Sequence, residues 1–287
     1  MDDMRIWTHV AGDGYRWHYR HFLPKPKPKP KARVVCLHGI QSHGGWYEGS
    51  CRRLRDEGCD VFFLDRRGSG LNTEAHGDAP SFRRVLDDVG EFLQTLRGPG
   101  TPPLFVVAVS WGGKLAAGID FRFPRLIDGI ALLAPGFCPQ VSPSPGEKWA
   151  ITTAALLSPE RYFPIPLNDP ALFTASETWQ KFIANDPLAL HEATARFLYQ
   201  SRRFDWYLRR AVRQVRVPVL LQLAGKDRII NIAKTRRFVE RFGSRHIRII
   251  DYPQAHHTLE FETASTVHLD DLCSWIDRTS QFLAWGR

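Results

Sequence analysis

The stretch L-F-V-V-A-V-S-W-G-G, from Leu104 to Gly113, determines how the rest of this sequence is interpreted. Its first six residues are all apolar and three of them are valines, a composition typical of a parallel strand buried on both faces. The apolar run stops at Ser110, and residues 114–119 begin a helical pattern. A serine at a sharp turn between a strand and a helix is typical of a nucleophile elbow, which holds the hydroxyl clear of the sheet edge.

The match to the usual elbow pattern, G-x-S-x-G, is incomplete because Ala108 takes the place of the first glycine. Small residues are needed at this turn since the backbones of strand and helix nearly touch, and a slightly wider turn accommodates one added methyl group. The alternative is a buried strand that ends in an ordinary Ser–Gly turn. The two readings differ in whether the chain also supplies an acid, a base and oxyanion donors in the right order.

Length and composition favour a globular protein with one large core. The 287 residues, 43% of them hydrophobic, suffice for a single domain or for a core with an inserted subdomain. The formal net charge is +9, but four of the lysines stand in the Pro–Lys run of residues 24–31, which predicts an exposed, extended connector. The remaining excess permits weak peripheral contact with an anionic membrane. The sequence contains no basic helix or aromatic–basic repeat of the kind that binds nucleic acid.

Cysteine usage and the N-terminus bear on the cellular compartment. The five cysteines are an odd number without a C-x-x-C pair, which argues against a disulfide scaffold and a structural zinc site. The sequence begins Met1-Asp2-Asp3 without an apolar run, and no stretch approaches the roughly 20 apolar residues of a membrane span. We therefore expect a soluble, cytoplasmic protein.

Short apolar runs alternate with helical patterns along most of the chain. Strands are predicted at residues 5–10, 15–22, 33–37, 61–64, 104–109, 130–133, 217–223 and 247–250, the first two forming a hairpin. Helices are predicted at residues 47–56, 82–96, 233–241 and 266–282. This alternation predicts an α/β fold, with a mostly parallel eight-stranded sheet covered by helices on both faces.

One segment interrupts the alternation. Residues 138–213 contain helical patches and many prolines but no convincing buried strand, and they lie between two predicted strands. Such an insertion rises from the carboxyl edge of the sheet, where ligands bind in open α/β folds. We therefore expect residues 138–213 to form a helical lid on a core made of residues 1–137 and 214–287.

A serine becomes a nucleophile when a histidine, held by a carboxylate, takes its proton. In this type of fold the order is serine, acid, histidine. Asp227 directly follows a predicted strand and is the preferred acid; Asp251 follows the next strand and is the alternative. The base is expected in the loop A-H-H-T, where the residues alone leave His256 and His257 as nearly equal candidates.

The oxyanion formed during acyl transfer needs two preorganised N–H donors. The residue after the nucleophile supplies one, the backbone amide of Trp111, and the loop H-G-I-Q-S-H-G-G-W-Y supplies the other, assigned to Ile40. His38 and His43 are expected to hold that loop by hydrogen bonds, with direct ligand contact as the alternative. They stand five residues apart across a glycine loop, which does not favour a metal site.

Four stretches together resemble the α/β-hydrolase superfamily, and more narrowly its monoacylglycerol lipase and lysophospholipase branch, grouped with the S33 serine aminopeptidases. Besides the elbow, residues 38–48 are similar to H-G-x-x-x-H-x-x-x-Y, residues 62–72 to a D-x-R-G-x-G loop, and residues 255–262 to G-A-x-H-x-L-x-x-E. The last pattern places the catalytic histidine on His257.

The resemblance implies an α/β-hydrolase fold with a carboxylic ester hydrolase activity and no cofactor. It implies Ser110 as nucleophile, Asp227 as acid, His257 as base, and the amides of Ile40 and Trp111 as oxyanion donors. Small acyl esters, above all acylglycerols or lysophospholipids, are the expected substrates.

Two other functions remain open at this point. Ser-Trp-Gly-Gly is similar to the elbow of proline iminopeptidases, but those enzymes need carboxylates that hold a substrate ammonium. Residues 138–213 contain nine Lys or Arg and seven Asp or Glu without an acidic cluster. A non-catalytic binding module on the same fold is the third possibility, and the filled triad positions disfavour it.

Overall fold

The computed structural model of the chain describes residues 3–24, 29–262 and 265–285. Its centre is an eight-stranded sheet in the order β1-β2-β4-β3-β5-β6-β9-β10. The strands are β1 (Met4–Val10), β2 (Arg16–Phe22), β3 (Ala32–Leu37), β4 (Cys59–Leu64), β5 (Leu104–Val109), β6 (Gly129–Leu133), β9 (Val219–Ala224) and β10 (Ile247–Tyr252). All pairs from β4 to β10 are parallel, and the β1–β2 hairpin joins β4 antiparallel.

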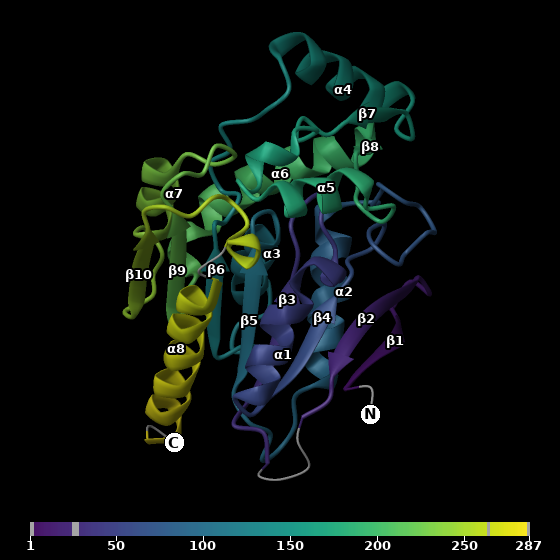
Figure 1. Ribbon diagram of the computed structural model, residues 1–287. Coiled ribbons are helices and arrows are strands. Elements are labelled where there is room, and N and C mark those ends of the chain that lie inside the picture. The colour runs from purple at the N-terminus through teal and green to yellow at the C-terminus, as the bar shows by residue number, and fades with distance from the viewer. Residues whose placement is uncertain (1–2, 25–28, 263–264, 286–287) are drawn as a thin grey trace.

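Helices cover both faces of this sheet, as the alternation of strands and helices predicts (Figure 1). The core helices are α1 (Glu48–Asp56), α2 (Phe82–Thr95), α3 (Gly112–Arg122), α7 (Ile232–Val239) and α8 (Ser265–Trp285). In the view of Figure 1, α1 and α8 lie in front of the sheet and α2 and α3 lie behind it. The central strands β4, β5, β6 and β9 are buried along their whole length, because both of their faces are covered.

Element boundaries differ from the predicted ones by a few residues where backbone chemistry intervenes. The strand predicted from residue 217 begins at Val219, because Pro218 has no N–H with which to join the ladder. The last strand continues to Tyr252, two residues beyond its apolar run. A helix-capping serine fixes the start of α2: the Ser81 hydroxyl accepts a hydrogen bond from the Arg84 amide at 3.1 Å.

The segment between β6 and β9 lies over the carboxyl edge of the sheet, at the top of Figure 1. It contains α4 (Pro145–Leu157), β7 (Tyr162–Pro164), η2 (Pro170–Leu172), α5 (Glu177–Asn185), β8 (Glu192–Thr194), α6 (Ala195–Ala211) and η3 (Val212–Gln214). The expectation of an all-helical insertion misses the antiparallel pair β7–β8. Strands of three residues are too short to produce an alternating pattern in the sequence.

Three other expectations concern the chain as a whole. Residues 25–28 lie outside the described part, so the extended connector predicted for residues 24–31 is only partly covered by the structure. All five cysteines are described and carry free thiols. Over the described ranges, no helix combines the length and the apolarity needed to cross a membrane.

A buried carboxylate fixes the two loops that follow β3 and β4. Asp65, which has no solvent exposure, accepts two hydrogen bonds from Arg20 at 3.0 Å each. It also accepts the amides of Gly44 at 2.7 Å and Leu71 at 3.0 Å. Burial alone would raise the pKa of Asp65, but the Arg20 charge and these amides outweigh it, so the net pKa is lowered.

The helix that follows the elbow can begin close to the sheet because its first residue has no side chain. A Cβ atom added at Gly112 would lie 2.6 Å from the Leu37 carbonyl oxygen and 2.7 Å from that of His38.

We expect Gly112→Ala to lower the free energy of unfolding by about 1–3 kcal/mol, because two backbone segments would have to move. Urea unfolding followed by tryptophan fluorescence measures this. Gly146→Ala is the control: a Cβ there meets nothing within 4 Å, and we expect a change below about 1 kcal/mol.

Acid stability should depend on Asp65. Because its folded pKa is lower than the unfolded value of about 3.9, it stabilises the fold above that pH, and the contribution is lost as the pH falls towards the folded value. Asp65→Asn should lose about 3 kcal/mol at pH 7, the lower end for a broken buried ion pair, because the buried Arg20 would keep only Glu48 as a counter-charge, 3.5 Å from its Nε. The stability of this variant should fall less steeply than that of the wild type below pH 5. Unfolding curves from pH 7 to pH 3 test this. The exposed Asp251, paired with Arg236, is the control; Asp251→Asn should change stability by at most about 1 kcal/mol.

Candidate active site

Ser110 lies at the corner between β5 and α3 in a backbone conformation that most residues avoid. Its φ is +49°, in the left-handed region. The corner is held from both sides: the Ser110 amide donates to the Leu133 carbonyl at 3.0 Å, and the Ser110 carbonyl accepts from Gly113 at 3.0 Å and Gly136 at 2.7 Å. Strain of this kind persists where surrounding contacts fix it, as at many active sites. Ala108 is fully buried between Leu37 and Leu132 on the flanking strands, where its methyl group is accommodated.

The predicted acid and base lie in direct contact. Nδ1 of His257 lies 2.7 Å from Oδ2 of Asp227, and both side chains are almost fully buried. The other carboxylate oxygen accepts the amides of Ile229 at 2.8 Å and Ile230 at 3.0 Å, which fixes its orientation. With its proton on Nδ1, the His257 ring presents Nε2 as an acceptor, and among the described residues this buried atom has no partner. Such an imidazole can take a proton from a neighbouring hydroxyl. In unliganded enzymes the hydrogen bond between the nucleophile and the imidazole is often long.

The alternative acid and base have other partners. Asp251 is exposed and binds Arg236 through both carboxylate oxygens at 2.5 Å. His256 directs its Nδ1 at Glu262, 3.0 Å away. The geometry therefore favours Asp227 and His257, although their catalytic roles stay predictions.

The backbone amides of Ile40 and Trp111 are the predicted oxyanion donors. Among the described residues, the N–H groups of Ile40 and Trp111 find no acceptor, and both residues line the cavity that Ser110 also lines. Gly39 brings the loop against the nucleophile: a Cβ added there would lie 3.3 Å from the Ser110 Cβ. The close approach of these two segments is what an oxyanion site requires.

His38 and His43 hold the loop after β3 by hydrogen bonds, as expected. The buried His38 ring bonds the Gly39 carbonyl through Nδ1 at 2.7 Å and accepts the Arg66 amide on Nε2 at 3.1 Å. Burial, together with the Arg66 charge, lowers the pKa of His38 to about 3, so it is neutral and structural at physiological pH. His43 bonds Asp186 of the inserted segment at 2.9 Å, and Trp46 donates to the same oxygen at 2.5 Å.

Arg66 is a residue next to the site that the sequence analysis missed. It is only 4% exposed, and its Nη2 donates to the Ile40 carbonyl at 2.5 Å. Its guanidinium carbon lies 5.1 Å from the ring centre of Trp111 and 5.0 Å from that of Phe197. Burial lowers the pKa of Arg66 to about 9. Arg66 occupies a variable position of the D-x-R-G-x-G pattern, so only its burial reveals that it holds the Ile40 loop against α6.

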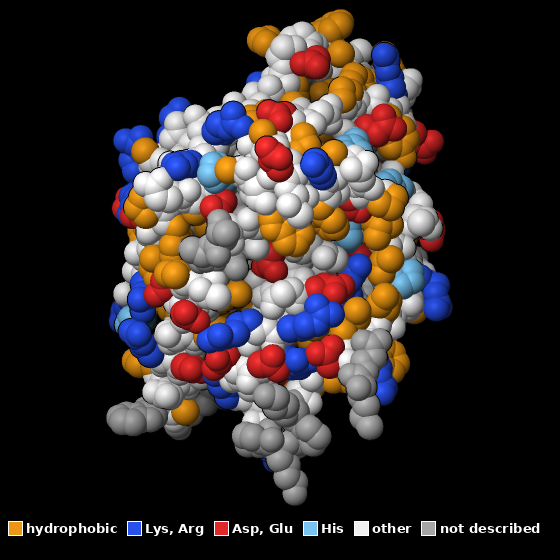
Figure 2. Space-filling view, in the orientation of Figure 1, with side chains coloured by type: hydrophobic (Ala, Val, Ile, Leu, Met, Phe, Trp, Pro, Cys, Tyr) orange, Lys and Arg blue, Asp and Glu red, His pale blue; other side chains and the backbone are white. Residues whose placement is uncertain are grey.

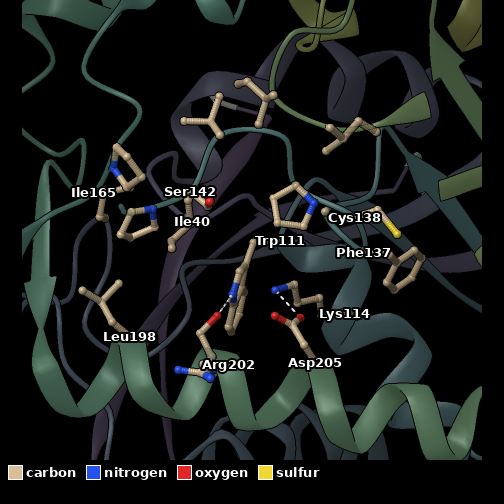
Figure 3. A pocket seen from close by; sticks show the side chains of 18 of the residues that line it. Ile40, Trp111, Lys114, Phe137, Cys138, Ser142, Ile165, Leu198, Arg202 and Asp205 are labelled. Carbon is tan, nitrogen blue, oxygen red and sulfur yellow. Dashed lines mark hydrogen bonds and ion pairs between the residues drawn. The ribbon is translucent and has the colours of Figure 1, made fainter. Parts of the chain in front are cut away.

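A cavity of about 590 Å³ lies between the core and the inserted segment and includes Ser110 in its wall. Figure 3 shows Trp111 beside an ion pair of Lys114 and Asp205, whose charged atoms lie 2.6 Å apart. The Trp111 indole donates to the Ser201 hydroxyl of α6 at 2.8 Å, which fixes the large side chain next to the nucleophile. Most of the remaining wall is apolar, including Ile40 and Leu198, so the cavity can accept an apolar chain.

Several known proteins are similar in sequence to this chain. A monoacylglycerol lipase of Mycolicibacterium smegmatis is 26% identical over 253 residues, which cover 85% of this chain and 87% of that protein. The phospholipase YtpA of Bacillus subtilis is 25% identical over 205 residues, 70% of this chain and 77% of that one. The lysophospholipase L2 of Escherichia coli is 33% identical over 110 residues, which cover 36% of this chain and 32% of that protein.

Solved structures confirm the α/β-hydrolase fold. The monoacylglycerol lipase of Paleococcus ferrophilus superposes with a TM-score of 0.82 at 19% identity, covering 92% of this chain and 99% of that one. A soluble variant of the monoglyceride lipase of Saccharomyces cerevisiae, bound to a substrate analogue, gives a TM-score of 0.83 at 18% identity, covering 97% and 96%. Residues 28–264 match the sequence profile of the serine aminopeptidase S33 family. The chain is therefore a member of the serine aminopeptidase S33 family, built on the α/β-hydrolase fold.

Proposed function

We propose that this protein is a serine hydrolase that cleaves carboxylic esters through an acyl-enzyme on Ser110, with acylglycerols or lysophospholipids as substrates. One observation carries the proposal above all: the buried Asp227–His257 pair leaves His257 Nε2 without a partner in a chain whose strained Ser110 lines an apolar cavity. The names of the relatives, a monoacylglycerol lipase, a phospholipase and a lysophospholipase, support the same substrate class.

In the proposed mechanism, Ser110 Oγ attacks the ester carbonyl carbon while His257 Nε2 takes its proton. The Asp227 carboxylate fixes the imidazole tautomer and stabilises the imidazolium that forms. The negative oxygen of the tetrahedral intermediate binds the amides of Ile40 and Trp111. His257 then protonates the departing alcohol, and a water molecule activated by the same imidazole releases the carboxylic acid and restores the Ser110 hydroxyl.

The inserted segment, residues 138–213, is assigned in this proposal as a lid on a core formed by residues 1–137 and 214–287. Support comes from the cavity, whose wall combines core residues such as Ile40 and Ile229 with Leu198 of α6. Figure 2 shows hydrophobic side chains at the top of the molecule, over α4. Trp149, Leu156 and Leu157 of this helix are 73%, 74% and 78% exposed, which supports peripheral contact with the lipid surface that would deliver the substrate.

Replacement of the nucleophile should abolish turnover without unfolding the protein. We expect Ser110→Ala to reduce hydrolysis of p-nitrophenyl butyrate at least about 1,000-fold, since no other hydroxyl stands at the elbow. A fluorophosphonate probe should label the wild type on Ser110 and leave the variant unlabelled, as read by mass spectrometry. Ser158→Ala, at the exposed end of α4, should keep full activity. Full activity in Ser110→Ala would refute the mechanism.

The aminopeptidase alternative makes an opposite prediction about substrates. A free substrate ammonium needs an unpaired carboxylate, but the single carboxylate among the described cavity residues is Asp205, which already binds Lys114. We therefore expect hydrolysis of p-nitrophenyl esters from two to sixteen carbons, with kcat/KM at least about 100-fold above that for proline p-nitroanilide. A preference for the anilide would establish the peptidase function instead. Absence of both activities and of probe labelling would favour a binding module.

A further inference from the structure

The cavity beside Ser110 carries an excess of positive charge that ester hydrolysis alone does not require. Its described wall contains five cationic side chains and a single carboxylate, Asp205. The cations are Lys114, Lys148, Arg202, Arg209 and Lys234. A neutral ester such as a monoacylglycerol offers nothing to pair with them.

Internal ion pairs do not neutralise this excess. Asp205 is occupied by Lys114, which is 4% exposed. Lys148 donates to the Ser142 hydroxyl at 3.1 Å, and the Arg202 guanidinium lies 5.5 Å from the ring centre of Trp206. Neither Arg209 nor Lys234 pairs with a carboxylate in the described ranges, so both remain available to a ligand.

Arg209 and Lys234 converge from different parts of the chain. Arg209 stands on α6 of the inserted segment, and Lys234 stands on α7 of the core. Both line the same cavity as Cys138. Burial raises the pKa of the Cys138 thiol, and the positive charges of Arg209 and Lys234 oppose that rise. The cavity wall therefore brings together a cation of the inserted segment and a cation of the core, and Figure 3 shows Cys138 and Phe137 of the same wall on the side of the Lys114–Asp205 pair.

An anionic group at Arg209 and Lys234 would be recognised by charge and by hydrogen bonds. Arginine binds the oxygens of a phosphate or carboxylate in a fork, and lysine adds a compact positive charge. The side chains of Arg209 and Lys234 are solvent-exposed, and apolar residues such as Val141 and Ile151 line other parts of the same wall. An amphiphile with one anionic group and one apolar chain matches both kinds of wall.

We propose that the preferred substrate is an anionic acyl ester, whose phosphate or carboxylate group binds between Arg209 and Lys234 while its chain lies along the apolar wall. The proposal rests on the ester hydrolase function proposed above and narrows its substrate class. The anion can belong to the alcohol, as in a lysophospholipid with a phosphate, or to the far end of the acyl chain, as in the monoester of a dicarboxylic acid.

Octanoyl substrates, which stay monomeric, test the preference without the charge effects of micelles. We expect kcat/KM for 1-octanoyl-glycerol-3-phosphate to exceed that for 1-octanoyl-glycerol at least about tenfold, and the ratio to shrink as salt rises from 0.05 to 0.5 M. A matched pair, the p-nitrophenyl monoester of octanedioic acid and p-nitrophenyl octanoate, shows whether the anion belongs to the acyl side instead. Equal rates within both pairs would overturn the proposal.

Charge-removing variants identify the residues responsible. Arg209→Gln and Lys234→Gln should each raise KM for the preferred anionic ester about threefold to tenfold and leave the neutral ester within about twofold. Arg210→Gln and Arg237→Gln are matched controls, because they remove exposed charges on the same helices outside the cavity wall. An equal loss for neutral and anionic esters in the Arg209 and Lys234 variants would contradict an anion site.

A binding measurement separates failure of this site from failure of the proposed function. Calorimetry with n-octyl phosphate, a non-hydrolysable anionic amphiphile, should show binding to the wild type and to Ser110→Ala, and weaker binding to Arg209→Gln. If no ester is hydrolysed but this pattern holds, the anion site stands and the hydrolase function fails. If esters are hydrolysed but binding is the same in Arg209→Gln and in wild type, the anion site fails.

Discussion

The candidate site depends on the hydrogen bonds that the buried carboxylate of Asp65 accepts. It joins Arg20 of β2, the amide of Gly44 in the loop after β3 and the amide of Leu71 in the loop after β4, all within 3.0 Å. The space around it excludes side chains: a Cβ added at Gly44 would lie 2.7 Å from Arg20, and one at Gly70 would lie 2.4 Å from Asp65. A buried charge without such partners would cost several kcal/mol, so these two loops keep one arrangement.

Further hydrogen bonds connect these two loops to the surroundings of Ser110. His38 ties the first loop to the Arg66 amide, and the Arg66 side chain in turn bonds the Ile40 carbonyl, which turns that loop towards Ser110. On its far side the loop binds the inserted segment through His43 and Asp186. The core and the insertion are therefore joined by polar contacts beside the site, and the proposed lid has a fixed anchor at the end of α5.

Much of this arrangement could be predicted from local patterns. The elbow and the alternation of strands and helices follow from apolar periodicity and turn chemistry, which are properties of neighbouring residues. The order serine, acid, histidine follows from the type of fold, and the family resemblance implies His257 as the histidine. The bare sequence left His256 and His257 almost equal, because both stand in the same loop; in the structure only His257 contacts Asp227, and His256 contacts Glu262. The strands of the β7–β8 pair escaped prediction since each has only three residues.

The sequence by itself determined the fold class, the position of the serine at the strand-to-helix corner and the set of candidate acids and bases. The family resemblance implied His257 rather than His256, and in the structure His257 contacts Asp227. Only the tertiary structure decided that Arg66 is buried against Trp111 and that Arg209 and Lys234 line the same cavity. The physical reason is the range of the forces involved. Strand and turn preferences act between neighbours in the chain. Burial and unbalanced charge depend on residues that meet only after folding, such as a lysine of α7 and an arginine of α6.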